Sequence, residues 1–286
     1  MGPYDTINKL EELRKKIKNY TTLTVAPILI FVLPVIMPEL AAIFPLLIIG
    51  TIGAMIAFSS SSRKTIIEFK KLYKETFVVQ LLSERFNDVV YNWDSGLALD
   101  YIRSFSVVRQ GNRFKTEDYL CATYNGVRFE QADVTIQYHT SGKNSHTTTY
   151  FKGRMFVFDF PYKNVASVRI FSDSFAYRAG LKNKKVELEN LDFNKRFDVD
   201  AFYEHDAFYF LTPQMMERMN ELKNRYGNVA VHLMGNKLFV AINMSADAFD
   251  HNYRQPVDYP TESAKINADM QVIVDIIDTL SLYVGT

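Results

Sequence analysis

Two long apolar stretches lie almost end to end near the start of the chain. They cover Thr21–Met37 and Leu40–Phe58, and only Pro38 and Glu39 separate them. Neither stretch holds a charged residue. A helix of about 17–19 residues rises roughly 26–29 Å, close to the ~30 Å thickness of the hydrocarbon core of a bilayer. The pattern therefore predicts a transmembrane helical hairpin over residues 21–58.

Basic residues on both flanks predict how this hairpin is oriented. The connection between the spans carries only Glu39. Two spans joined by so short a connection are antiparallel, so both flanks face the same side, and the positive-inside rule makes that side the cytoplasm. We therefore expect both termini in the cytoplasm. The flanking cations are Arg14, Lys15, Lys16 and Lys18 before the hairpin and Arg63, Lys64, Lys70 and Lys71 after it.

Two other structures for the apolar block stay open. It can form a buried helical hairpin inside a soluble core. It can also form one true span after a re-entrant first half, because Pro27 and Pro34 interrupt the first stretch. A cleaved signal peptide is disfavoured, since the charged leader is long and the apolar block is double.

Composition limits the classes of function. The chain has 286 residues and a formal net charge of +1, so it lacks the basic footprint of a nucleic-acid-binding protein. Its one cysteine, Cys121, excludes an intramolecular disulfide. This residue sits in a predicted strand, where we expect a buried and inert thiol.

Helical patterns surround the hairpin on both sides. Residues 1–20 form a predicted amphipathic helix with Asp5 as its N-cap, and residues 59–100 form a predicted juxtamembrane helical segment. The main helix of that segment is expected over Arg63–Val90. It can pack on the soluble domain, continue the second span, or mediate self-association as a short coiled coil.

From Asp118 the apolar period changes to two, which is typical of strands. Strands are predicted at Tyr119–Tyr124 and Val127–Tyr138, joined by a tight turn at Asn125-Gly126. Residues 101–286 should therefore form a cytoplasmic α+β domain with a mainly antiparallel sheet and flanking helices. Further strands are expected at 147–160, 166–171, 185–188, 197–199, 207–211, 229–234 and 237–242, with helices from Pro213, capped by Thr212, and over 261–283.

Four stretches together carry a family resemblance: Lys115–Tyr119, Tyr150–Phe160, Leu188–Phe193 and Phe208–Met219. With the order of helix, apolar hairpin, long helix and strand-rich domain, the chain resembles the bacterial membrane proteins grouped as domain of unknown function three-one-three-seven. That resemblance implies a bacterial inner-membrane location and this architecture. It implies no activity and no catalytic residue.

A histidine pair is the most specific candidate site. If Gly142-Lys143 forms a two-residue turn, His139 lies opposite His146 with Cβ atoms roughly 4.5–5.5 Å apart, and the two imidazoles could share a divalent metal. No carboxylate or cysteine lies near in sequence to complete the ligand shell, so an exposed polar hairpin is the favoured interpretation.

His205 and Asp206 form a second candidate, an acid–base pair in an expected turn, for which a solvated surface is again favoured. The sequence contains no Walker-type loop, dinucleotide-binding fingerprint, nucleophile elbow or HExxH helix. We therefore name no catalytic, cofactor-binding or metal residue and no cofactor, and expect a non-enzymatic protein.

The sequence favours a membrane-anchored binding or scaffolding module. Its expected partners are the lipid bilayer and a protein of unknown identity, with self-association open and nucleic acid excluded. The alternative is a membrane-tethered metal-dependent enzyme or hydrolase that uses His139 with His146, or His205 with Asp206. Convergence of these side chains in one pocket would favour the enzyme.

Overall fold

The computed structural model describes the chain except for residues 1, 26–43, 161–164, 177, 181–182, 246 and 284–286. The described residues divide into two compact units. Met1–Gln80 and His251–Lys265 form the first, which we call the helical unit. Leu81–Asp250 and Ile266–Thr286 form the second, which we call the sheet unit.

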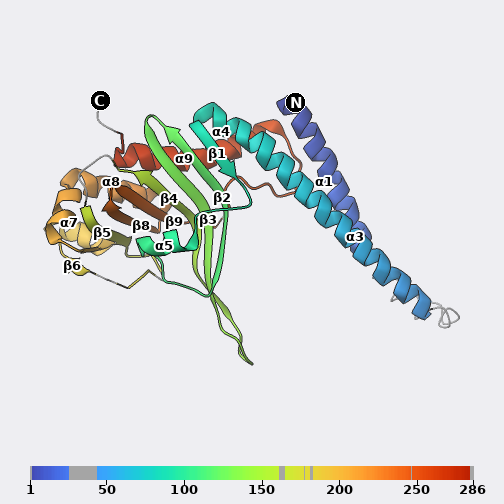
Figure 1. Ribbon diagram of the computed structural model, residues 1–286, viewed down its shortest axis with the longest axis horizontal. Helices are drawn as coiled ribbons and strands as arrows, with labels where there is room; N and C mark the ends of the chain where they lie inside the picture. Colours follow the sequence, from blue (N-terminus) through green and yellow to red (C-terminus); the bar gives the residue numbers. More distant parts are fainter. Residues whose placement is uncertain are drawn as a thin grey trace. The chain divides into compact units, whose positions relative to one another are not determined.

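Two long helices make up most of the helical unit. They are α1 (Pro3–Val25) and α3 (Phe44–Leu72), which lie side by side in Figure 1. A π-helical segment, η3 (Tyr73–Val78), continues α3 without a break. One face of α1 is buried, as expected of an amphipathic helix, but the helix begins at Pro3, so Asp5 lies in its first turn and is not its N-cap, and it runs on to Val25. The buried stripe is Ile7, Leu10, Leu13 and Ile17.

Residues 26–43 of the predicted membrane hairpin lie outside the described residues. Residues 26–37 of the first span and 40–43 of the second belong to the part that is not described. The rest of the second span, residues 44–58, is helical and forms the first half of α3. Over the described residues, we find no helix with both the length and the apolar character needed to cross a bilayer.

The sheet unit is built on a twisted sheet in which every pairing is antiparallel, and the described residues contribute nine strands to it. This confirms the α+β class with helices before the sheet. The strand order is β1-β2-β3-β4-β9-β8-β5-β7-β6. The strands are β1 (Asn87–Asn92), β2 (Arg113–Tyr124), β3 (Val127–His139), β4 (Thr147–Asp159), β5 (Val165–Ser172), β6 (Lys184–Val186), β7 (Phe197–Ala201), β8 (Val229–Gly235) and β9 (Lys237–Asn243).

The turn between β2 and β3 has the predicted geometry. Asn125 and Gly126 both have positive φ angles, 46° and 81°, as a type I′ turn requires. The pairing Tyr124↔Val127 closes the hairpin at this turn. Local sequence therefore sets the register of these two strands.

Helices cover both faces of the sheet. On one face, Phe105 of α5 (Leu99–Phe105) stacks on Phe239 of β9 with ring centroids 4.5 Å apart. On the other, the guanidinium of Arg154 in β4 donates to the Asp269 carbonyl of α9 (Tyr259–Leu280) at 2.7 Å. Side chains of β4 are therefore buried on both faces. The remaining helices are α4 (Val79–Arg85), α6 (Leu191–Arg196), α7 (Glu204–Phe210) and α8 (Pro213–Tyr226).

Two predicted elements are wrong. The helix expected over Arg63–Val90 ends at Arg85, and the next residues form β1, whose alternating side chains pair with the edge of β2. The strand expected at 207–211 is part of α7. In that helix Ala207 and Phe210 are buried whereas Phe208 and Tyr209 are about half exposed, so the aromatic run follows a helical period.

Candidate functional site

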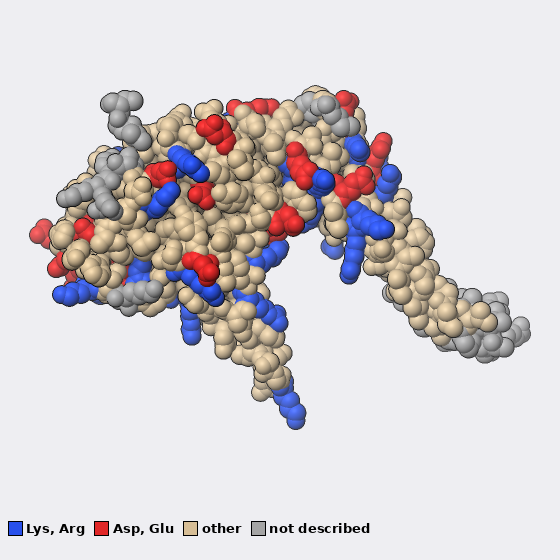
Figure 2. Space-filling view, in the orientation of Figure 1, with Lys and Arg blue, Asp and Glu red and all other residues tan. Residues whose placement is uncertain are grey.

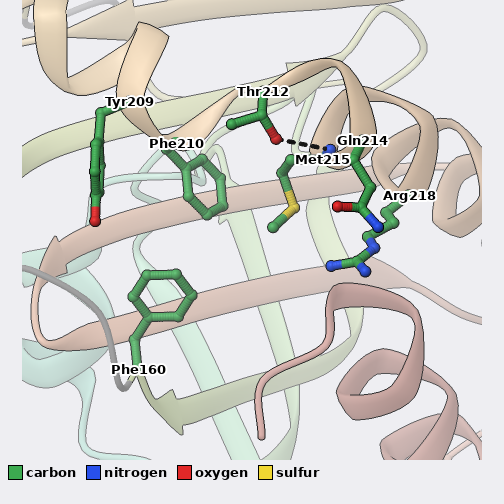
Figure 3. Close-up of a pocket in the computed structure, with 7 residues that line it drawn as sticks. All are labelled: Phe160, Tyr209, Phe210, Thr212, Gln214, Met215 and Arg218. Carbon is green, nitrogen blue, oxygen red and sulfur yellow. Dashed lines mark hydrogen bonds between the residues drawn. The ribbon is translucent and has the colours of Figure 1, made fainter. Parts of the chain in front are cut away.

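A cavity of about 260 Å³ opens beside the start of α8 in the sheet unit. Figure 3 shows the rings of Phe160 and Phe210 and the thioether of Met215 along its apolar side. The amide of Gln214 and the guanidinium of Arg218 lie together on its polar side. The cavity is therefore lined by apolar side chains on one side and by a cation on the other. Its lining residues are Phe160, Tyr209, Phe210, Thr212, Gln214, Met215 and Arg218.

Local sequence signals position the polar side of this pocket. The Thr212 hydroxyl caps α8 by accepting a hydrogen bond from the Met215 backbone N–H at 3.2 Å, and Pro213 fits the first turn. Gln214 and Arg218 are four residues apart, so they project from the same face of the helix. The predicted cap is thus confirmed, and it fixes where the pocket's polar groups lie.

The apolar side needs a tertiary contact. Phe160 comes from the end of β4, where its backbone N–H donates to the Asn236 carbonyl at 2.8 Å. Its ring meets that of Phe210 edge to face, with centroids 5.7 Å apart. Both side chains are at least 95% buried, at 5% and 4% exposure. The wall is therefore part of the core and is already formed without a ligand.

Arg218 is the chemically distinctive group in the pocket. It is half-buried, and its guanidinium forms no ion pair with any described residue. An arginine presents a planar fork of donors that matches a carboxylate. A volume of about 260 Å³ is just below the usual range of ligand pockets, roughly 300–1,000 Å³. The pocket accordingly suits one apolar side chain or ring that carries an adjacent anion.

The predicted histidine pair does not meet. The register pairs His139 with Thr147, and the Thr140 N–H donates to the His146 carbonyl at 3.0 Å. Since successive residues of a strand point to opposite faces, this one-residue shift places His139 and His146 on opposite faces. A longer loop, which turns between Gly142 and Ser145, replaces the predicted two-residue turn. The expectation that the two imidazoles face each other is therefore wrong.

Each histidine has a threonine neighbour instead. His139 Nδ1 lies 2.9 Å from the Thr147 hydroxyl, and His146 Nδ1 lies 2.9 Å from the Thr140 hydroxyl. All four residues lie near the tip of the β3–β4 hairpin. Over the described part of the chain, no group of three or more His, Cys, Asp or Glu side chains is placed to hold a metal ion.

His205 and Asp206 lie at the start of α7 rather than in a turn between strands. Their closest side-chain atoms, Nε2 and Oδ1, are 3.4 Å apart, but the His205 side chain is 78% exposed. The Asp206 carboxylate accepts the Ala166 N–H at 3.0 Å. This contact ties α7 to β5. Five strand steps of ~4.8 Å each separate β3 from β7, the strand that precedes α7, so His139 is remote from this pair.

Cys121 is half-buried in β2, which is less burial than expected. The Tyr119 side chain of the same strand donates to Glu130 across the β2–β3 pair at 3.0 Å. No other cysteine exists in the chain, so this thiol has no intramolecular disulfide partner.

Two buried arginines lie outside the predictions made from the sequence. Arg154 is 1% exposed, and its guanidinium donates to Gln131 Oε1 and to the Asp269 carbonyl. Arg169 is equally buried and forms a two-pronged ion pair with Asp200, with Nε to Oδ1 at 2.9 Å. A sequence signal exists, since Arg169 is the one cation of β5 and Arg154 directly precedes the apolar run Met155–Phe158. These groups hold the sheet together and do not line the pocket in Figure 3.

Asp133 is a buried acid of the sheet unit with a raised pKa. Its Oδ2 accepts the Ala248 N–H, whereas its buried Oδ1 has no hydrogen-bond partner among the described residues. The Arg154 Nε is 4.0 Å from that oxygen. Burial, only partly offset by Arg154, raises the pKa of Asp133 to about 7. Nearby, Tyr91 donates to Asp118, and burial raises the pKa of this tyrosine as well.

Ser167 and His232 form a further polar contact that the sequence does not indicate. The Ser167 hydroxyl lies 2.9 Å from His232 Nε2, and His232 Nδ1 faces the Phe105 carbonyl at 2.5 Å. A carbonyl only accepts, so Nδ1 carries the proton and Nε2 accepts from the serine. Neither side chain lines the pocket in Figure 3. The pair links β5, β8 and α5.

Comparison with known proteins identifies the domain that holds the pocket. Residues 149–282 match the family model described as "Protein of unknown function (DUF3137)". This range contains every residue that lines the pocket, and it confirms the resemblance noted from the sequence. No curated protein matches the chain.

One solved structure shows a distant likeness. It is the crystal structure of the mycobacterial trehalose monomycolate transport factor A, TtfA, at 8% sequence identity and a TM-score of 0.41. The match covers 74% of this chain and 96% of that one. A likeness this distant carries no inference about what the present chain does.

Proposed function

We propose that this chain, whose residues 149–282 carry a DUF3137 domain, is a membrane-anchored binding module of the bacterial inner membrane. In this proposal residues 21–58 lie in the bilayer, and both termini and the sheet unit are cytoplasmic. The pocket beside α8 grips one apolar side chain of a partner protein together with a neighbouring carboxylate. The position of Arg218, without an ion pair to any described residue and at the edge of a ready-made aromatic wall, carries the proposal.

Burial and charge support this assignment of the pocket. Buried cations are normally paired, as Arg154 and Arg169 are here. Arg218 is half-buried without an anion among the described residues, so an incoming carboxylate would gain a charge-assisted hydrogen bond. Phe160 and Phe210 are held by the core, so an apolar group enters without a large ordering cost.

The surface of α3 supports the membrane anchor. Within the predicted second span, Leu46, Ile49, Ile52 and Ile56 are 77%, 71%, 49% and 66% exposed. Such a row of bare aliphatic side chains is costly in water and favourable in lipid. On the face seen in Figure 2, Lys and Arg, with Asp and Glu among them, gather over the middle of the helical unit, and its described far end carries no charge. This distribution suits an anchor whose basic collar meets headgroups.

The enzyme alternative requires His139, His146, His205 and Asp206 to converge. The first two lie on opposite faces of a hairpin, and the other pair lies beyond several strands of the same sheet. The binding module is therefore the function that the geometry supports best.

Binding of a small anionic aromatic molecule to the full chain in lipid nanodiscs tests the proposal. The probe is N-acetylphenylalanine, and the signal is the carbon-13 methyl resonance of Met215. With about 15 non-hydrogen atoms at about −0.3 kcal/mol each, the expected Kd is on the order of 1 mM. We expect a saturable shift of the Met215 methyl. N-acetylphenylalanine amide, which lacks the carboxylate, should bind about tenfold more weakly.

Two variants test whether binding of the acid depends on Arg218 itself or on the net charge of the chain. Arg218→Gln should weaken binding of the acid about tenfold and leave binding of the amide unchanged. Lys143→Gln, which removes an exposed cation at the tip of the β3–β4 hairpin, should change neither. If the acid and the amide bind the wild-type chain equally, or if Met215 does not respond, the proposed pocket chemistry is wrong.

A further inference from the structure

A second cavity, of about 190 Å³, lies entirely within the helical unit. One wall is a face of α1, from Arg14 to Thr22, and the other is Tyr253 with Arg254 from the segment before α9. Three of its lining side chains are cations: Arg14, Lys18 and Arg254. Among the described residues, no acidic side chain lines it. The cavity is therefore a concave site of strongly positive charge.

One hydrogen bond joins the two walls. The Glu11 carboxylate of α1 accepts the Val257 N–H at 3.2 Å and also receives two hydrogen bonds from the Arg14 guanidinium, both at 2.6 Å. Within the other wall, the Arg254 N–H donates to the Asn252 side chain at 3.1 Å. Glu11 therefore links α1 to the segment that carries Arg254.

Two of the three cations have no anion of their own within the described chain. Arg14 is neutralised by Glu11, but Lys18 and Arg254 form no ion pair with any described residue. The Thr21 and Thr22 hydroxyls donate to the Ile17 and Lys18 carbonyls at 2.8 and 3.0 Å, so each gives its one proton to the helix backbone. The donors left for a ligand are therefore those of Lys18 and Arg254, and these cations match the oxygens of a phosphate.

The position of the cavity along α1 indicates which phosphate-bearing molecule it binds. Arg14, Ile17, Thr21 and Thr24 follow one another at helical spacing, so they form one stripe of the helix. The charge-free stretch begins at Thr21, where the cavity ends. A second hollow, of about 440 Å³, includes Thr24 of this stripe, and its other lining residues are Met55, Ile56, Ser59, Ser60 and Arg63. Along α1 the cations of the cavity therefore come directly before the charge-free stretch, in the order of a lipid headgroup and its acyl chains.

We propose that this cavity binds the phosphodiester headgroup of an anionic phospholipid from the cytoplasmic leaflet. Lys18 and Arg254 donate to the phosphate oxygens, and the acyl chains follow the charge-free stretch of α1 that begins at Thr21. The inference rests on the proposed membrane anchor, because a soluble chain would meet no such leaflet. It adds a site that is separate from the pocket beside α8.

Lipid retention by the full chain tests the proposal. The protein is reconstituted in nanodiscs of phosphatidylcholine with an equal share of phosphatidylglycerol, released, and examined by native mass spectrometry. The wild-type chain should retain phosphatidylglycerol in preference to phosphatidylcholine. The double variant Lys18→Gln/Arg254→Gln should lower this preference at least about fivefold.

The matched control is Lys9→Gln/Lys16→Gln, which removes the same charge from the opposite, exposed side of α1. It should keep the preference within about twofold of wild type, a spread that allows for general screening. Equal losses of the preference in the two double variants would overturn the proposal, because the preference would then depend on the total surface charge and not on the cavity. Equal retention in wild type and Lys18→Gln/Arg254→Gln would overturn it too.

Competition with inorganic phosphate tests whether the cavity binds a lipid headgroup or a free phosphate ion. If a roughly 10-fold excess of phosphate displaces phosphatidylglycerol from the wild-type chain, the site belongs to a free phosphate and the lipid assignment is wrong. Flotation with vesicles of pure phosphatidylcholine examines the anchor by itself. All variants should float; failure of the wild-type chain to float would count against the anchor and would leave the retention data as the separate measure of the cavity.

Discussion

The sheet unit and the helical unit differ in whether their cations have partners and whether their apolar side chains are buried. In the sheet unit the fully buried cations Arg154 and Arg169 find their partners within the same unit. In the helical unit Lys18 and Arg254 line a cavity without an anion among the described residues, and α3 exposes a row of aliphatic side chains. The fully buried cations of the sheet unit thus have internal partners, and its Arg218, which forms no ion pair with any described residue, is only half-buried. The helical unit presents both kinds of group that a bilayer with anionic headgroups would satisfy.

The largest expected effect comes from breaking an internal ion pair of the sheet unit. Arg169→Ala leaves the Asp200 carboxylate buried and unpaired, so the free energy of unfolding should fall by about 3–5 kcal/mol. Urea unfolding of the full chain, followed by circular dichroism, measures it. Lys18→Gln in the helical unit should change that free energy by less than about 0.5 kcal/mol. Similar losses in the two variants would remove the contrast between the units.

A loss of stability with rising pH is expected from the sheet unit. The pKa of Asp133 is raised to about 7 in the folded chain from an ordinary value of 3.8. Between these values the folded state holds a proton that the unfolded state has released, so stability should fall as pH rises from about 4 to 7. A difference of this size between the folded and unfolded pKa values corresponds to at most about 4 kcal/mol.

Asp133→Asn provides the control, because an amide cannot ionise. Unfolding of this variant, measured at pH 5 and pH 8, should show a correspondingly smaller difference than that of the wild-type chain. A wild-type chain whose stability rises over the same interval would contradict the assignment of this proton to Asp133.

A smaller effect should distinguish two exposed isoleucines of α3. Ile49 lies at the middle of the predicted second span, and Ile67 lies among charged residues on the same helix; they are 71% and 58% exposed. Lysine at the centre of a span costs about 2.5–3.5 kcal/mol of insertion free energy. Ile49→Lys should therefore reduce the carbonate-resistant membrane fraction, whereas Ile67→Lys should leave it unchanged. Equal behaviour of the two variants would show that Ile49 does not contact lipid.

Much of the sheet unit could be predicted because its signals are local. The Asn125-Gly126 turn, the long strands on either side of it and the Thr212 cap all depend on residues close in sequence. The errors also have local causes. The 207–211 run is aromatic enough to suggest a strand. The helix α7 forms there because it buries Ala207 and Phe210 on one face.

The candidate site was predictable only in part. Sequence placed Gln214 and Arg218 on a capped helix, but nothing in it brings Phe160 from β4 against Phe210. For the histidines the error was one residue of register. His139 and His146 would face each other across a two-residue turn, and the longer loop separates them.

The sequence by itself determined the long strands β2, β3 and β4, the turn after β2, the cap of α8 and the charge-free block that suggests a membrane anchor, because period, capping and charge act over a few residues. Tertiary structure alone decided which cations are paired and which line cavities. Whether a charged side chain has a partner depends on contacts between segments distant in sequence. The free energy lost when it has none depends on how deeply it is buried.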